Sequence, residues 1–330
     1  VRLAITLVPT AHHQGGSEIT LVVLCTGLPR MVIVDSLEAL ELVAENLKVK
    51  GAAGAVFAVD CEGADLPRRG QLSLLQISTH GECFVIDVLQ LGHKAVSHAF
   101  KALLENPGVT KLMFDCRHES DALFHQLGIQ LCNVLDLQLK EVMGRDETTE
   151  EHAKSLACLG KNVNQEPDLY EHIYHLKNLN QCLSSFGLMD RAALKRKRTV
   201  EKQVHCDPDF WLTRPLSLDA VFCAEHDVDV LFLLDARLPP VSVDALKTAS
   251  LAYVNLFRDQ AVPKDMFVDH GFLPLHVLPF ASPESSGALQ MCAGCFRQLP
   301  ASTVSHSLEG QGLQCCTLCY AISLMHRNRE

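Results

Sequence analysis

The tripeptide Asp60-Cys61-Glu62 places two carboxylates directly after the apolar run Ala55–Val59. That run predicts a β-strand, and residues two apart in a strand project from the same face. Asp60 and Glu62 are therefore expected to reach one point, as ligands of a shared divalent cation must. Carboxylate oxygens favour Mg²⁺ or Mn²⁺. Alone the pair is a weak signal, because surface strands carry two such acids by chance.

A second set of metal-binding residue types lies near the C-terminus. Cys292-x-x-Cys295 is followed, after twenty intervening residues, by Cys316-x-x-Cys319. Two C-x₂-C pairs at this separation predict a tetrahedral structural zinc site, which would fold a segment with little core of its own. Because Cys315 is adjacent to Cys316, either of them fits the third ligand position. A reactive tail without metal is the alternative.

The elements expected to hold Asp60 and Glu62 alternate between β and α. Met31–Val34 predicts a strand, and Ser36 is expected to cap a helix that runs to about Leu47. Turns at Arg69-Gly70 and His80-Gly81 favour an antiparallel meander of the strands Ala55–Val59, Leu72–Ile77 and Cys83–Ile86. Further elements are expected at His93–Leu104, Lys111–Phe114, Glu119–Leu127, Val134–Leu135 and Leu218–Leu234, the last of them capped by Ser217. Together they predict an α/β fold with a mixed sheet flanked by helices.

Composition divides the chain into four parts. Residues 1–29 hold two apolar runs and predict a β segment, either a hairpin or the remnant of a small β module. Residues 30–260 carry the α/β pattern. Residues 261–289 lack periodicity and predict a linker. Residues 290–330 are the cysteine-rich tail, for which a small C-terminal zinc ribbon is predicted.

Three motifs in the α/β region give the pair Asp60 and Glu62 its weight. The first runs from Val59–Gly63 through Leu74–Ser78 to Phe84–Asp87, and it resembles the opening of ribonuclease D-like 3′–5′ exonucleases. Lys111–Leu123 resembles the second motif of that family. The third motif is resembled by Arg214–Ser217 together with Cys223–Val228, and the three motifs occur in the family's order. The branch most similar is the exonuclease 3′–5′ domain-containing family related to Egalitarian.

The resemblance implies a ribonuclease H-like sheet and a site in which four acids hold two Mg²⁺ or Mn²⁺ ions for phosphodiester hydrolysis. Matched position by position, the catalytic and metal-binding acids are Asp60, Glu62, Glu119 and Asp227. The substrate that it implies is single-stranded RNA or DNA with a free 3′ end, with RNA favoured.

Two positions depart from the family pattern. Glu119 stands where an Asp is expected, and its extra methylene moves the carboxylate by about one bond length. Cys223 stands four residues before Asp227, where a Tyr normally orients the attacking water, and a thiol is a weak hydrogen-bond donor. Asp121 faces about 200° away from Glu119 on the helix and is expected to be solvated.

Two functions therefore stay open. The favoured one is a metal-dependent 3′–5′ exonuclease, because an acid is present at all four positions. The other is a catalytically weak or inactive exonuclease-fold protein that binds RNA or acts as an adaptor.

A formal charge of −10 excludes an overall basic field, so a polyanion would need a local patch or bound metal ions. The predicted nucleic-acid-binding residues are Lys195, Arg196, Lys197, Arg198 and Arg214, although a solvated helix face explains the basic stretch equally well. Trp211 has the ring to stack a base, but packing against the third-motif helix is favoured.

The remaining features concern the setting of the protein. No apolar run reaches the roughly 20 residues of a transmembrane helix, and no secretory signal is evident. The other nine cysteines lie singly, which predicts reduced thiols in an intracellular protein, cytoplasmic or nuclear. The tail is expected to offer a surface to a protein partner or to nucleic acid.

Overall fold

The computed structural model describes residues 30–66, 68–159, 163, 170–259, 271–278, 288–308 and 312–327. The β segment predicted for residues 1–29 lies outside the described residues, as does most of the predicted linker. Within the described ranges, no helix is both long and apolar enough to cross a membrane.

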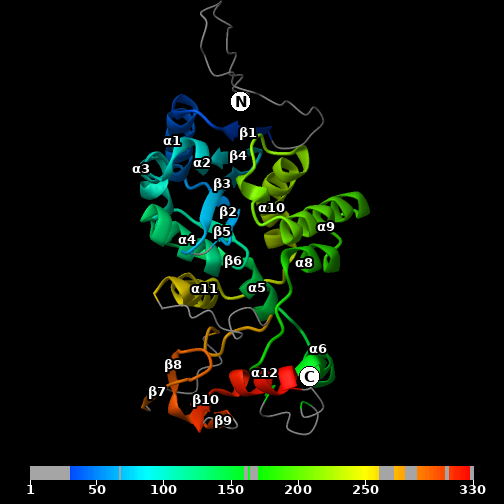
Figure 1. Ribbon diagram of the computed structural model, residues 1–330. Coiled ribbons are helices and arrows are strands. Elements are labelled where there is room, and N and C mark those ends of the chain that lie inside the picture. The colour runs from blue at the N-terminus through cyan, green and yellow to red at the C-terminus, as the bar shows by residue number, and fades with distance from the viewer. Residues whose placement is uncertain are drawn as a thin grey trace, which may run out of the picture.

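A six-stranded sheet forms the centre of the α/β region (Figure 1). Its strands lie in the order β1-β4-β3-β2-β5-β6, and of these six only β3 runs opposite to the others. The strands are β1 (Arg30–Val34), β2 (Phe57–Ala64), β3 (Gln71–Thr79), β4 (Glu82–Asp87), β5 (Lys111–Met113) and β6 (Val134–Asp136). The predicted antiparallel meander and mixed sheet are confirmed.

Helices cover both faces of this sheet (Figure 1). One face packs against α1 (Leu37–Ala52), α3 (His93–Leu104), α4 (Arg117–Leu127) and α11 (Val243–Arg258). The other face packs against α8 (Leu179–Ser185), α9 (Arg191–Cys206) and α10 (Leu218–Arg237). Three other short helices are α2 (Val88–Leu91), α5 (Leu137–Met143) and α6 (Thr149–Ser155).

The predicted helix starts are confirmed by their caps. The hydroxyl of Ser36 accepts a hydrogen bond from the backbone N–H of Ala39 at 3.3 Å, and that of Ser217 accepts from Ala220 at 3.1 Å. Helix α3 has the predicted bounds, whereas α1 and α10 run further than predicted and α4 begins two residues earlier.

Alternation along β2 decides which face its acids occupy. The core beneath α1 and α3 receives every second residue of the strand, namely Phe57, Val59 and Cys61. Ala58 instead packs into the core beneath α10. Asp60 and Glu62 share the parity of Ala58 and therefore lie on the α10 face. They lie within β2 rather than after it, because β3 continues to pair with β2 as far as Ala64.

Asp121 is fully buried, so the prediction that it is solvated is wrong. Its carboxylate accepts hydrogen bonds from Arg68: from the backbone nitrogen at 2.6 Å, from Nε at 2.9 Å and from Nη2 at 2.6 Å. Arg68 also donates to the carbonyl of Phe257, so one ion pair joins the β2–β3 turn, α4 and α11. The partner comes from a distant turn, which the local helical sequence does not reveal.

The cysteine-rich tail forms two small hairpins and a helix. β7 (Leu289–Met291) pairs with β8 (Gln298–Pro300), β9 (His306–Leu308) pairs with β10 (Leu313–Cys315), and α12 (Thr317–Arg327) follows. Their core is shared with earlier parts of the chain, since it includes Leu159, Tyr170, Phe272, Leu299, Leu318 and Ile322. Residues 271–278 of the predicted linker are thus packed in place, and Phe272 forms a β-bridge with His175.

Replacing Asp121 by Asn should lower the free energy of unfolding by about 3 kcal/mol, because it removes one partner of a buried ion pair. The matched control is Glu150→Gln, which breaks an exposed ion pair with Lys154 and should cost less than about 0.5 kcal/mol. Denaturant unfolding of both variants measures the difference. Equal losses would contradict a structural role for Asp121.

Candidate metal centres

Asp60 and Glu62 of β2 meet Asp227 of α10 on one side of the sheet. One ligand oxygen of each lies within 4.8 Å of the other two. The three acids line a cavity of about 430 Å³, which we call the acidic cavity. Its other walls come from α8, α9 and the short 3₁₀ helix η3 (Phe210–Leu212), and they include Trp211.

Burial and repulsion from neighbouring carboxylates disfavour the charged forms of Asp60 and Glu62. Burial and repulsion from Asp227 raise the pKa of Asp60 to about 7. Burial, Asp60 and Asp227 likewise raise the pKa of Glu62. A bound cation would relieve this repulsion, so the all-oxygen donor set fits a hard divalent ion such as Mg²⁺ or Mn²⁺.

Glu119 lies in the first turn of α4 and is not a member of the trio. It is close enough to Asp60 that burial and repulsion from that residue raise its pKa. Its Oε2 atom is buried and has no hydrogen-bond partner among the described residues. A buried carboxylate oxygen without a partner requires an explanation, and a metal ion beside Asp60 supplies one.

Cys223 lies one turn before Asp227 on α10 and is buried in the wall of the acidic cavity. Burial and repulsion from Asp227 raise the pKa of its thiol to about 12. The thiol is therefore protonated near neutral pH and cannot act as a base. The neighbouring His226 contacts the ring of Phe222, with 5.3 Å between ring centroids, and is not among the cavity-lining residues.

The structure divides the predicted basic stretch into two sets, and the inner set is already paired. Lys197 is buried on the inner side of α9, where its ammonium forms an ion pair with Asp227. Arg196 forms an ion pair with Asp219 and lies 4.2 Å from the centroid of the Phe222 ring. The protein itself therefore supplies the partners of both cations.

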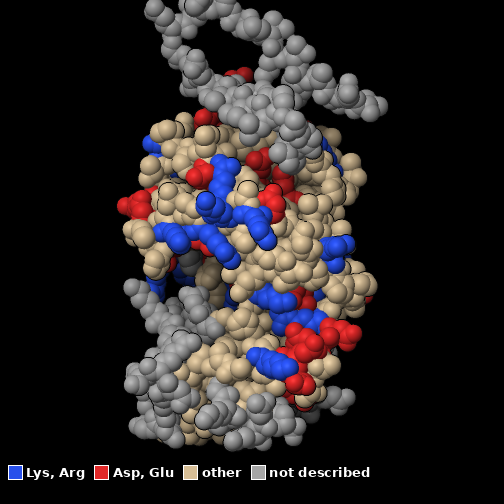
Figure 2. All heavy atoms as spheres, turned by 90° about the vertical axis from the view of Figure 1, so that its right-hand side faces the viewer, with Lys and Arg blue, Asp and Glu red and all other residues tan. Residues whose placement is uncertain are grey.

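Lys195 and Arg198 form an outer set, on the exposed side of α9 together with Arg191 and Lys202. The four residues follow the spacing i, i+4, i+7, i+11, which places side chains on one side of a helix. We call them the α9 basic stripe; none of them forms an ion pair with another residue in the described ranges. Figure 2 shows Lys and Arg side chains gathered on this side of the molecule. The same helical spacing in the sequence would have added Arg191 to the predicted nucleic-acid-binding residues.

Arg214 anchors the third motif to the sheet. Its guanidinium donates to both oxygens of Asp87, from Nε at 2.5 Å and from Nη2 at 2.8 Å. It also donates to the hydroxyl of Ser73 at 2.9 Å and to the carbonyls of Trp211 and Thr213 at 2.8 and 3.1 Å. All five N–H groups are thus occupied, so the geometry does not support the prediction that Arg214 binds nucleic acid. Trp211 is buried, as the packing interpretation predicted.

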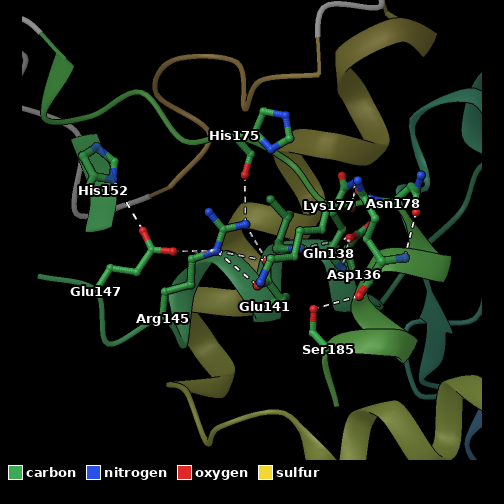
Figure 3. Close-up of polar contacts among 12 residues, drawn as sticks. Asp136, Gln138, Glu141, Arg145, Glu147, His152, His175, Lys177, Asn178 and Ser185 are labelled. Carbon is green, nitrogen blue, oxygen red and sulfur yellow. Dashed lines mark hydrogen bonds and ion pairs between the residues drawn. The ribbon is translucent and has the colours of Figure 1, made fainter. Parts of the chain in front are cut away.

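An ion network beside α5 fixes the chain that leads into α8, which lines the acidic cavity; Figure 3 shows the network. Glu141 accepts hydrogen bonds from Arg145 at 2.6 Å and from Lys177 at 2.8 Å. Although burial opposes its ionisation, these two partners hold the pKa of Glu141 below its usual value. Arg145 also donates to the carbonyl of His175 at 2.9 Å. The chain is thereby held just before Asn178, which caps α8 and lines the cavity.

The four predicted cysteines form a second cluster, in the tail. The sulfur atoms of Cys292, Cys295, Cys316 and Cys319 lie within 4.8 Å of one another. The backbone N–H groups of Gly294, Cys295 and Cys316 point at the sulfur of Cys292, at 3.3, 3.5 and 3.2 Å. Gly294 fits tightly, because a Cβ atom there would lie 2.6 Å from the Cβ of Cys319. Four thiols in this arrangement fit a structural zinc ion.

The structure distinguishes Cys316 from Cys315 at the ambiguous position. Cys315 is buried in the core of the tail and lies outside the cluster, and burial raises the pKa of its thiol to about 11. His306 stacks on Tyr320, with 4.8 Å between ring centroids, and is also outside the cluster.

With this geometry established, comparison with known proteins identifies the family. A model of the 3′–5′ exonuclease family matches residues 31–241. The chain belongs to this family. The mouse (Mus musculus) and human (Homo sapiens) proteins named piRNA biogenesis protein EXD1 are 31% and 28% identical over 206 and 204 residues, each covering 62% of this chain. The chain spans about a third of the length of these curated relatives, 33% and 36%.

Solved structures support the fold of this exonuclease-family chain. Trypanosoma brucei RNase D in complex with GMP has a TM-score of 0.57 and 21% identity, over 86% of this chain and 89% of that one. The complex of the same enzyme with RNA U12 has a TM-score of 0.57 and 22% identity, over 87% and 91% of the two chains. The resemblance to ribonuclease D-like exonucleases and the predicted fold class are confirmed.

Replacing Cys316 by Ser should abolish stoichiometric zinc, because one of four thiolate ligands is lost. Cys315→Ser is the matched control: it removes the adjacent thiol, which lies outside the cluster, and should retain about one equivalent of zinc. Elemental analysis of the two purified variants measures the metal. Loss of zinc from Cys315→Ser with retention in Cys316→Ser would reverse the assignment.

Proposed function

We propose that the chain is a divalent-metal-dependent 3′–5′ exonuclease that acts on single-stranded nucleic acid, and on RNA in preference to DNA. The observation that carries the proposal is the meeting of Asp60, Glu62 and Asp227 at one cavity in a chain of the 3′–5′ exonuclease family. The unpartnered oxygen of Glu119 supplies a fourth acid beside them.

Asp60, Glu62, Glu119 and Asp227 are the residues that would hold Mg²⁺ or Mn²⁺. When bound, such ions make water nucleophilic near neutral pH and neutralise charge on the phosphate. The cavity walls then have to position the terminal nucleotide. The cavity is lined by apolar side chains such as Phe114 and by the polar amide of Asn178. This mixture suits a sugar and base, which have both apolar and polar surfaces.

The proposed activity is slow, because Cys223 stands in the position of the family's water-orienting Tyr and a thiol is a weak hydrogen-bond donor. General acid–base assistance is typically worth about 10²–10⁴-fold in rate. Two observations support the alternative function, an inactive RNA-binding adaptor. They are Cys223 in the position of the family's Tyr and the ion pair between Asp227 and Lys197.

The preference for RNA rests on the relatives. Two similar proteins are named for piRNA biogenesis, and a structure with the same fold contains RNA U12. The α9 basic stripe is the surface that we assign to the phosphate backbone, because α9 also supplies Lys197, Val200, Glu201 and Val204 to the wall of the acidic cavity. A strand that follows the stripe would end near the acids.

We also propose that the cysteine cluster holds a structural zinc ion and that residues 290–330 form a ribbon that shares a core with the exonuclease domain of residues 30–260. The ribbon is the surface that we assign to a protein partner. The thirteen cysteines in the described part of the chain are all unpaired, which supports a reducing intracellular setting, cytoplasmic or nuclear.

Replacing Asp60 by Ala should reduce the rate of shortening of a single-stranded RNA by about 100-fold or more, because a ligand of the catalytic ions is lost. The assay follows a 5′-labelled strand with Mn²⁺ or Mg²⁺, beside a strand whose 3′ end is blocked. Asp146→Ala, which changes an exposed acid away from the cavity, is the control and should leave the rate unchanged. No ladder from the wild type, or an equal ladder from Asp60→Ala, would rule out the nuclease and leave the adaptor.

Replacing Lys195, Arg198 and Lys202 together by Gln should weaken RNA binding and flatten its dependence on salt, because each lost phosphate contact lowers the slope by about 0.7 for a single strand. The control changes Lys94, Lys154 and Lys247 to Gln, which removes the same charge from exposed positions on other helices. Binding of a short labelled RNA at several salt concentrations measures the slope. Equal slopes for the two triple variants would contradict the assignment of the stripe.

A further inference from the structure

Lys197 brings a cation into the acidic cavity from the protein itself. Its ammonium pairs with Asp227, and its side chain is only 7% exposed. The cations next to it along α9 behave differently: Lys195 and Arg198 point outward, and Arg196 pairs with Asp219. Lys197 is the only Lys or Arg among the described residues that line the cavity.

The position of Lys197 bears on all three acids of the trio. Its charge lowers the pKa of both Asp60 and Glu62, against the larger effects of burial and mutual repulsion, which raise them. The metal-free cluster is therefore partly neutralised by a charge that cannot diffuse away. An ion pair of this kind stabilises the arrangement most when it is shielded from water, as this one is.

The same contact opposes metal binding. A divalent ion coordinated by Asp227 and an ammonium paired with that carboxylate would be two cations within a few ångströms, and they repel strongly in this largely buried site. The ammonium pairs with Oδ1 of Asp227, so a metal ion that binds this carboxylate either displaces the ammonium and loses the energy of the pair, or shares the carboxylate with it and is repelled.

We propose that Lys197 is a tethered competitor of the metal ion: it stabilises the empty acidic cluster and lowers the affinity of the cluster for Mn²⁺ or Mg²⁺. This inference rests on the proposed function, because it assumes that the acids bind a divalent ion. It makes Lys197 a residue that sets metal affinity, rather than a nucleic-acid contact as its place in the basic stretch suggested.

The test measures metal binding without nucleic acid. Wild type, Lys197→Met and Lys195→Met are freed of loosely bound ions by dialysis and titrated with MnCl₂ in a calorimeter. Methionine keeps the length and apolar stem of lysine but removes its charge, and Lys195→Met removes the same charge from the outer side of the same helix. Lys197→Met should bind Mn²⁺ at least about tenfold more tightly than wild type, whereas Lys195→Met should stay within about twofold.

Thermal melting of the same proteins gives a second readout. Without Mn²⁺, Lys197→Met should melt at a lower temperature than wild type, and Mn²⁺ should raise its melting temperature by more than it raises that of wild type. If Lys197→Met does not fold, Lys197→Gln, a second neutral replacement, is judged by the same criteria.

The possible results separate the two proposals. Equal or weaker Mn²⁺ binding by the neutral variants would overturn the role of Lys197 while leaving the metal site intact. Absence of Mn²⁺ binding by every protein tested would overturn the metal site and, with it, the proposed nuclease. An increase in affinity that Lys195→Met reproduces in full would mean that net charge, and not the Lys197 contact, is responsible.

Discussion

Repulsion among carboxylates that the fold forces together is the interaction around which the α10 side of the sheet is arranged. Alternation along β2 turns Asp60 and Glu62 toward α10, and the helix brings Asp227 to the same point. Such a cluster is unfavourable unless a cation or protons neutralise it. The raised pKa values of Asp60, Glu62 and Glu119 and the ion pair between Lys197 and Asp227 are two responses to that one constraint.

The two sides of helix α9 carry positive charges with different roles. Its inner side carries Lys197 into the cavity, and its outer side carries the α9 basic stripe. This division explains how a chain with a formal charge of −10 presents positive charge next to an acidic site. Of the Lys and Arg residues of α9, only the four of the stripe have no ion-pair partner within the described ranges. Substitutions along the helix should therefore have different effects according to the side on which they fall.

Local signals in the sequence were sufficient for much of the fold and of the site. Caps at Ser36 and Ser217, the meander and the C-x₂-C spacing each follow from residues close together in the chain, and each is found in the structure. The features that were missed depend on partners far away in sequence. Asp121 pairs with Arg68, Arg214 with Asp87, and Lys197 of α9 with Asp227 of α10. No local sequence motif predicts these contacts.

The core that the tail shares with earlier residues means that the tail is not a detachable module. Tyr170 and Phe272 pack with Leu318 and Ile322, and the chain that leaves Tyr170 continues past the β-bridge at His175 to Asn178 in the cavity wall. A truncation before residue 290 would expose apolar surface on the remaining protein. It would also remove packing that holds the segment from Tyr170 to Asn178, which leads to the cavity. Shortened versions designed to isolate the exonuclease domain should therefore be expected to aggregate, unless the tail is retained or that surface is redesigned.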